Sequence, residues 1–151
     1  MGAQGLKPID GFTSVEKEKS RLLDQLKSSK LGRQDVIAKH IDEAEDLFGQ
    51  GRNHPAIGEA RSALQAVIEE TVILQETKVN KRSGGGVKNQ IDFLGQEGTL
   101  STDEQKAFLS AWSFLCAGNH PGMSSEEEGR IGTILCLEFI QILLIKGKTL
   151  L

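Results

Sequence analysis

The sequence predicts an all-α fold, an up-and-down bundle of four to five helices. Apolar residues recur at three- and four-residue intervals along most of the 151 residues, which is the period of an amphipathic helix. Breaks that contain glycine or proline separate these periodic segments, and no stretch alternates apolar and polar residues as a half-buried strand does. A chain of this length fits a single domain, 1–151, with a core of its own.

The first periodic segment covers about 13–30. Thr13 stands three residues before Glu16, the spacing of a capping box, and the apolar stripe that follows is Val15, Leu22, Leu23 and Leu26. Gly32 interrupts the chain after this segment. We therefore interpret 1–31 as an N-terminal helical extension and 33–146 as the bundle proper.

Two amphipathic helices follow the break. The first covers about 36–48 and ends at the two glycines of "FGQGRN", as helices commonly do. The second runs from Pro55 to about Lys78, with apolar residues at three- and four-residue intervals throughout. It is the longest periodic segment of the chain.

A basic, glycine-rich loop at 79–88 separates this helix from the second half. A triple glycine, 84–86, cannot hold a helix without a large entropic cost, and the surrounding cations have no acidic residue among them. These cations are candidates for nucleic-acid binding: Lys78, Lys81, Arg82 and Lys88.

Three further helices are expected after the loop: a short one in "IDFLGQEG", one over 101–116 behind a Ser101/Glu104 capping box, and one opening at Ser124 or Ser125. The last contains a 13-residue apolar run, 133–145, which is too short to span a bilayer. It is either the central core helix or a dimer seam. We predict these core residues: Leu64, Val67, Ile68, Trp112, Leu115, Ile134, Leu135 and Phe139. For the seam, we predict a homodimer interface that includes Ile140, Leu143 and Leu144.

Composition narrows the classes of function. With 18 basic and 21 acidic residues the net charge is −3, so nucleic acid could be held only by a local patch. Cys116 and Cys136 lie in apolar helical contexts without neighbouring ligands, which favours buried thiols in a reducing compartment and no metal site. The N-terminal residues lack the apolar core of a signal peptide. We expect a cytoplasmic protein with no cofactor, no metal and no membrane partner.

Two histidines occur in nearly the same pentad, once in "NHPAI" at 53–57 and once in "NHPGM" at 119–123. Asparagine is a good N-cap and proline is favoured at the first helical position, so 53–55 is interpreted as a helix start at Pro55. At 119–123 the next helix starts several residues further on. Asn119 and His120 are therefore unneeded as caps and are candidate catalytic residues.

From 35 to 146, the order of helices and the segment "TDEQKAFLSAWSFLCAGNHPG" before a long apolar helix resemble the HEPN superfamily, small helical bundles of toxin, abortive-infection and CRISPR-associated proteins. The resemblance implies dimerisation, with the loops before the last helix meeting across the interface. It also implies, for active members, RNA cleavage without metal by an Arg, a polar residue and a His four to six positions after the Arg.

The chain departs from that pattern at the arginine. No arginine stands at 114–116, four to six positions before His120, and without a cation the phosphate charge would not be stabilised. Three arginines on other elements could supply it: Arg52, Arg61 and Arg130, of which Arg61 and Arg130 are expected on solvated helix surfaces.

Two hypotheses follow from the incomplete motif. The first is a catalytically degenerate interaction module of a prokaryotic defence or toxin–antitoxin system, with an RNA or protein partner. The second is a metal-independent endoribonuclease that uses Asn119 and His120. The missing arginine favours the module.

Overall fold

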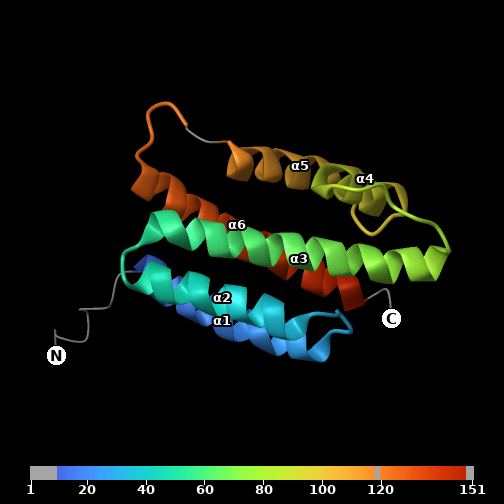
Figure 1. Cartoon of the computed structure of the whole chain (residues 1–151), viewed down its shortest axis with the longest axis horizontal. Helices are drawn as coiled ribbons and strands as arrows, with labels where there is room; N and C mark the ends of the chain where they lie inside the picture. Colours follow the sequence, from blue (N-terminus) through green and yellow to red (C-terminus); the bar gives the residue numbers. More distant parts are fainter. Residues whose placement is uncertain (1–9, 118–119, 149–151) are drawn as a thin grey trace.

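The computed structural model describes residues 10–117 and 120–148, and these form helices without any strand (Figure 1). The helices are α1 (Asp10–Ser28), α2 (Gln34–Gly49), α3 (Asn53–Val79), α4 (Val87–Gln96), α5 (Thr102–Cys116) and α6 (Ser125–Gly147). The all-α prediction is confirmed. The described part of the chain contains six helices, one more than four to five, and the short helix expected between the basic loop and α5 is among them.

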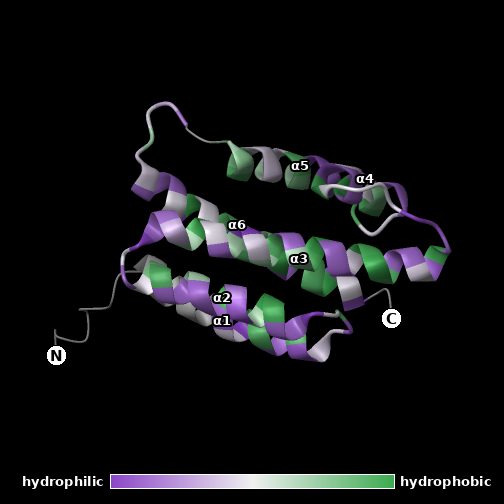
Figure 2. Cartoon of the chain, viewed as in Figure 1, coloured by the Kyte–Doolittle hydropathy of each residue, from purple (hydrophilic) through white to green (hydrophobic). Residues whose placement is uncertain are grey.

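The chain passes back and forth along the long axis of the molecule. In Figure 1, α1, α3 and α6 run one way, and α2 and α5 run the other. The most extensive contact is between α3 and α6, with α1 and α2 against one side of this pair and α4 and α5 against the other. Hydrophilic and hydrophobic residues alternate along the helices (Figure 2), as expected where each helix buries one face.

Part of the apolar surface of α6 is buried inside the chain. Because α1, α2, α3 and α5 all contact α6, the three residues predicted for a dimer seam lie in the core: Ile140 and Leu143 are 0% exposed and Leu144 is 2% exposed. These side chains cannot form an interface in the folded chain, so that assignment is corrected. Leu22 and Leu26 of α1 belong to the same core, so the segment interpreted as an extension is part of the bundle.

The predicted core is correct for α3 and α5 and displaced on α6. Leu64, Val67, Ile68, Trp112 and Leu115 are all buried. On α6 the predicted residues Ile134, Leu135 and Phe139 are only half-buried, and the buried apolar side chains are instead Cys136, Leu137, Ile140, Leu143 and Leu144.

Two helix starts are held by complete capping boxes. Ser101 and Glu104 cap α5, and Ser124 and Glu127 cap α6, with each serine hydroxyl accepting from the glutamate N–H and each glutamate accepting from the serine N–H. The third predicted box is wrong, because α1 begins at Asp10 and Thr13 therefore lies inside the helix.

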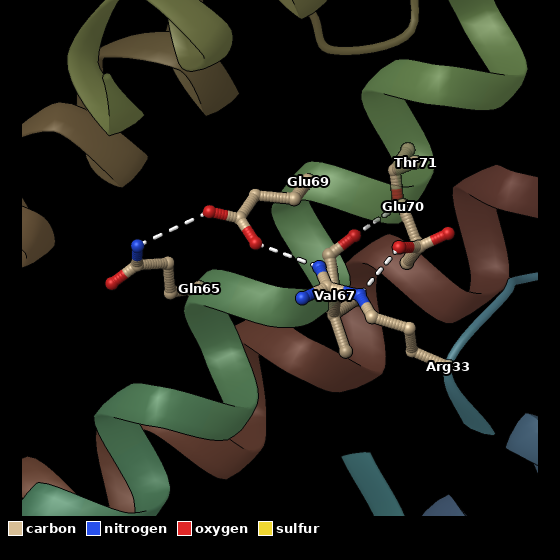
Figure 3. A network of polar contacts seen from close by, with 6 residues as sticks. All are labelled: Arg33, Gln65, Val67, Glu69, Glu70 and Thr71. Carbon is tan, nitrogen blue, oxygen red and sulfur yellow. Dashed lines mark hydrogen bonds and ion pairs between the residues drawn. The ribbon is translucent and has the colours of Figure 1, made fainter. Parts of the chain in front are cut away.

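A network of charged side chains fastens the α1–α2 turn to α3 (Figure 3). The guanidinium of Arg33 donates from Nε to Glu70 Oε2 and from Nη2 to Glu69 Oε1, each at 2.7 Å. Glu69 also accepts from Gln65 at 3.1 Å. The hydrogen bonds that Arg33 donates to Glu69 and then to Glu70 raise the pKa of the guanidinium above its ordinary value.

Among the helices described, none combines the length and the apolar character needed to cross a membrane.

Candidate functional site

The histidines of the two Asn-His-Pro segments, His54 and His120, line one pocket. Its volume is about 330 Å³, and it lies where the start of α3, the end of α5 and the start of α6 meet. Its lining includes the polar side chains of His54, Arg61, Cys116, His120 and Glu128, together with Pro55, Ile57, Gly58, Phe114, Leu115, Ala117 and Gly129. Each of the two pentads therefore contributes its histidine to a single cavity.

The start of α3 differs from the prediction. The helix begins at Asn53 with Arg52 as its N-cap, and no side chain caps it, so Asn53 is not the cap and Pro55 is not the first helical residue. What brings this helix start to α6 is Gly129, because a Cβ there would overlap the carbonyl of Asn53 and the backbone of His54. A residue without a side chain lets the two backbones touch beside the pocket.

His120 is held in a defined position. Its ring stacks on the ring of Phe114, with centroids 4.0 Å apart and planes 17° apart. Its Nε2 lies 3.0 Å from the carbonyl oxygen of Phe114 and 3.8 Å from Oε2 of Glu128. The side chain is 19% exposed, so the imidazole is fixed yet reachable from the pocket.

Arg61 supplies a cation to the same pocket. It is half-buried rather than solvated as expected, and its Nη1 donates to the carbonyl oxygen of Leu115 at 2.7 Å. This bond uses one of the five N–H donors of a guanidinium and leaves the others to bind an anion. Arg52 and Arg130 are exposed and do not line the cavity.

Glu128 is a pocket residue that the sequence did not indicate. It lies in the first turn of α6, its side chain is 14% exposed, and its Oε2 is buried with no hydrogen-bond partner among the described residues. Glutamates in the first turn of a helix are common for reasons of capping, so nothing in the pattern "SSEEE" distinguished Glu128 from its neighbours.

The two cysteines differ. Cys136 is fully buried, and burial raises the pKa of its thiol to about 12, while the charge of nearby Arg61 acts in the opposite direction. Cys116 is exposed, contrary to the predicted burial, because it is the last residue of α5 and lies at the pocket rim. The candidate Asn119 lies outside the described residues.

The basic residues are exposed at the other end of α3. Lys78, Lys81, Arg82 and Lys88 are all solvent-accessible, and Lys81 pairs with Glu97 at 3.3 Å. A shallow pocket of about 410 Å³ lies at this end, lined by Ile73, Glu76, Thr77, Asn80, Lys81 and Arg82. The structure therefore separates the basic loop from the histidine pocket by most of the length of α3 (Figure 1).

One group of side chains in the described part of the chain has carboxylates close enough for a metal ion: Asp42, Glu45 and Asp46. The ammonium of Lys19 lies 3.1 Å from Asp42 and 3.0 Å from Glu45, so a cationic side chain already neutralises part of this cluster. The four ligand-type residues of the histidine pocket do not converge in this way.

No family model matches the chain, and the searches of curated proteins and of solved structures found no similar protein.

Proposed function

We propose that the chain is a HEPN-like domain that cleaves RNA without a metal ion, with His120 and Arg61 in the reacting pocket. The observation that carries this proposal is that Arg61 and His120, 59 residues apart in sequence, line one cavity. The sequence argued against catalysis because no arginine stood at the expected spacing before the histidine. A cation contributed by α3 removes that objection.

The chemistry is a transesterification within the RNA strand. The 2′-hydroxyl attacks the neighbouring phosphorus after losing its proton to a base, the bond from phosphorus to the 5′-oxygen breaks, and that oxygen takes a proton. The products are a 2′,3′-cyclic phosphate and a 5′-hydroxyl. His120 acts as one proton-transfer group, His54 across the pocket is available as the other, and Arg61 stabilises the charge on the phosphorane.

A second candidate is the degenerate interaction module of a defence or toxin–antitoxin assembly. It is favoured by two hydrogen bonds to the last carbonyls of α5: Arg61 binds the carbonyl of Leu115, and His120 binds that of Phe114. These bonds alone would give both residues a structural role, because they satisfy carbonyls at the end of a helix. In either case we propose a homodimer and a protein or RNA partner. The basic residues Lys78, Lys81, Arg82 and Lys88 would contact RNA phosphates.

The test is cleavage of single-stranded RNA by purified protein in the presence of a chelator. Wild type should release fragments with 2′,3′-cyclic phosphate ends, and His120→Gln and Arg61→Gln should each lower the rate at least a hundredfold. His40→Gln is the matched control for the histidine, because His40 pairs with Glu59 at 2.8 Å outside the pocket. Arg130→Gln is the control for the arginine.

Circular dichroism must show that the four variants remain folded. Wild-type protein that leaves RNA intact would reject the nuclease and leave the interaction module. Cleavage that survives His120→Gln would reject the proposed site.

A further inference from the structure

Nε2 of His120 faces two hydrogen-bond acceptors from two different helices. The nearer is the carbonyl oxygen of Phe114 in α5 at 3.0 Å, and the second is Oε2 of Glu128 in α6 at 3.8 Å. The imidazole and the carboxylate are both largely withdrawn from water, since the side chains of His120 and Glu128 are 19% and 14% exposed.

This arrangement decides which ring nitrogen carries the proton. A backbone carbonyl can only accept a hydrogen bond, and an ionised carboxylate can only accept as well. A lone pair on Nε2 would therefore meet two electron-rich oxygens, whereas an N–H at Nε2 satisfies the nearer oxygen and is attracted by the other. The neutral imidazole is thus held as its Nε2–H tautomer, and Nδ1 keeps the lone pair.

The unpartnered oxygen of Glu128 gives a reason for the carboxylate to be there. Its Oε2 is buried and accepts no hydrogen bond from the residues described, which is unfavourable for a structural carboxylate. Beside an imidazole that gains a proton during a reaction, the same oxygen stabilises the imidazolium, as the carboxylate of a catalytic triad does. The other titratable side chains that line the pocket are His54 and Arg61 from α3 and Cys116 from α5.

We propose that Glu128 is a positioning residue for His120: together with the Phe114 carbonyl it fixes the proton on Nε2, so that Nδ1 is the nitrogen that takes the proton from the substrate. This assignment rests on the proposed function for its catalytic meaning. The tautomer itself does not depend on any reaction.

The first experiment is a long-range ¹H–¹⁵N correlation spectrum of the imidazole groups in the full chain, recorded at a pH where His120 is neutral. The signals of His120 are identified by their loss in His120→Gln. The wild-type pattern should be that of an Nε2–H tautomer. An Nδ1–H pattern, or an equal mixture of the two, would overturn the proposal even if the protein cleaves RNA.

The second experiment replaces the carboxylate with a neutral side chain of the same shape. Glu128→Gln should shift His120 toward a mixture of tautomers, because the glutamine amide can donate an N–H to Nε2. It should also lower kcat at least tenfold with little change in KM. Glu126→Gln, an exposed residue in the same turn, is the matched control and should alter neither.

The two failures are separable. If Glu128→Gln leaves both the spectrum and kcat at wild-type values, the positioning role is wrong while the nuclease stands. If wild type shows the Nε2–H tautomer and its change in Glu128→Gln but cuts no RNA, the nuclease is wrong while the pairing stands. If Glu128→Gln does not fold, the tautomer of His120 in the wild-type protein still tests the proposal.

Discussion

Glu70 shows how a single residue in this chain depends on its partner. The residue is 8% exposed and lies on α3 beneath the α1–α2 turn, where a carboxylate without a cation would be strongly unfavourable. Arg33 provides that cation from a left-handed backbone conformation with φ of 50°, which a non-glycine residue adopts only at some cost. The strained turn thus places Arg33 where it can neutralise Glu70.

We expect Arg33→Ala to lower the free energy of unfolding by about 1–3 kcal/mol, because Glu70 is left buried without its donor. Alanine is strained at this φ as arginine is, so the substitution isolates the loss of the side chain. Urea denaturation followed by circular dichroism measures the change. Lys39→Ala is the control: Lys39 is 76% exposed and 3.9 Å from Glu43, and its loss should cost less than about 0.5 kcal/mol. Equal effects at the two positions would show that Glu70 does not need Arg33.

At the scale of elements, the contact between α3 and α6 depends on two glycines that face different obstacles. A Cβ at Gly129 would meet the backbone of Asn53 and His54, which cannot move without shifting α3, whereas a Cβ at Gly132 would meet the tip of the Ile57 side chain, which can rotate. Of these two glycines, only Gly129 therefore stands where a side chain would force the two helices apart.

Substituting alanine at three glycines should give three different results. Gly129→Ala should destabilise the protein by at least about 2 kcal/mol and disturb the pocket at His54, while Gly132→Ala should cost less. Gly58→Ala is the control, because a Cβ there has open space and alanine favours helix by up to about 1 kcal/mol. Thermal melting of the three variants measures the order. A Gly129→Ala protein as stable as Gly58→Ala would disprove the backbone contact.

The start of α5 is tied to the end of α6 through Glu104. The backbone N–H of Ser101 and then the ammonium of Lys146, 2.9 Å away, lower the pKa of Glu104 below its ordinary value of 4.5. Because the folded-state pKa is lower than the unfolded one, this stabilisation is complete above about pH 4.5 and is lost as the pH falls through the folded-state pKa.

We therefore expect Glu104→Gln to lower the free energy of unfolding at pH 7 by less than about 1 kcal/mol, since the Glu104 side chain is still 30% exposed and water screens the ion pair. The difference from wild type should shrink as the pH falls from about 5 to 3. Urea titrations at several pH values check this dependence. A difference that persists unchanged at pH 3 would mean that glutamine disturbs packing rather than removing a charge interaction.

At the scale of the whole molecule, α6 packs against several helices of its own chain and leaves part of its surface exposed. The buried side chains of Ile140, Leu143 and Leu144 face helices on several sides, and the exposed large apolar residues of α6 are Ile131 and Ile145, at 37% and 48%. The predicted homodimer remains a prediction, and its surface would have to include residues of this second kind.

Leu143→Glu should unfold the protein, because a charge would be placed at a position that is 0% exposed. Ile145→Glu, two residues further along α6, should leave the fold intact. Circular dichroism reports folding, and sedimentation equilibrium at micromolar concentration reports mass. If Leu143→Glu instead gave a folded monomer from a wild-type dimer, the interior position of α6 would be wrong.

The helices were largely predictable from the sequence because their boundaries are set by neighbouring residues. The predicted 55–78 is α3 at Asn53–Val79, and 101–116 is α5 at Thr102–Cys116. The buried face of α6 was not predictable. When a helix is apolar nearly all round, its sequence does not show which side faces the core. Ile134 and Cys136 look equally suited to a core, yet only Cys136 is fully buried.

The candidate site was predictable only in part, for a related reason. His120 stood out because its loop lacked a structural explanation. Arg61 and Glu128 join it only because Gly129 lets α3 and α6 approach each other. The proximity of these residues depends on packing between helices that are distant in sequence, and no local sequence pattern indicates it.

The length of α3 sets the distance between the two candidate contact regions, the histidine pocket and the basic loop. With 27 residues at 1.5 Å each, the helix measures about 40 Å, and the histidine pocket and the basic loop lie at its opposite ends. A mononucleotide can occupy one region but cannot touch the other. A stacked single strand that advances about 3.4 Å per nucleotide needs about twelve nucleotides to reach both. Affinity for short oligonucleotides would therefore be insensitive to the loop lysines, and only longer strands would register their loss.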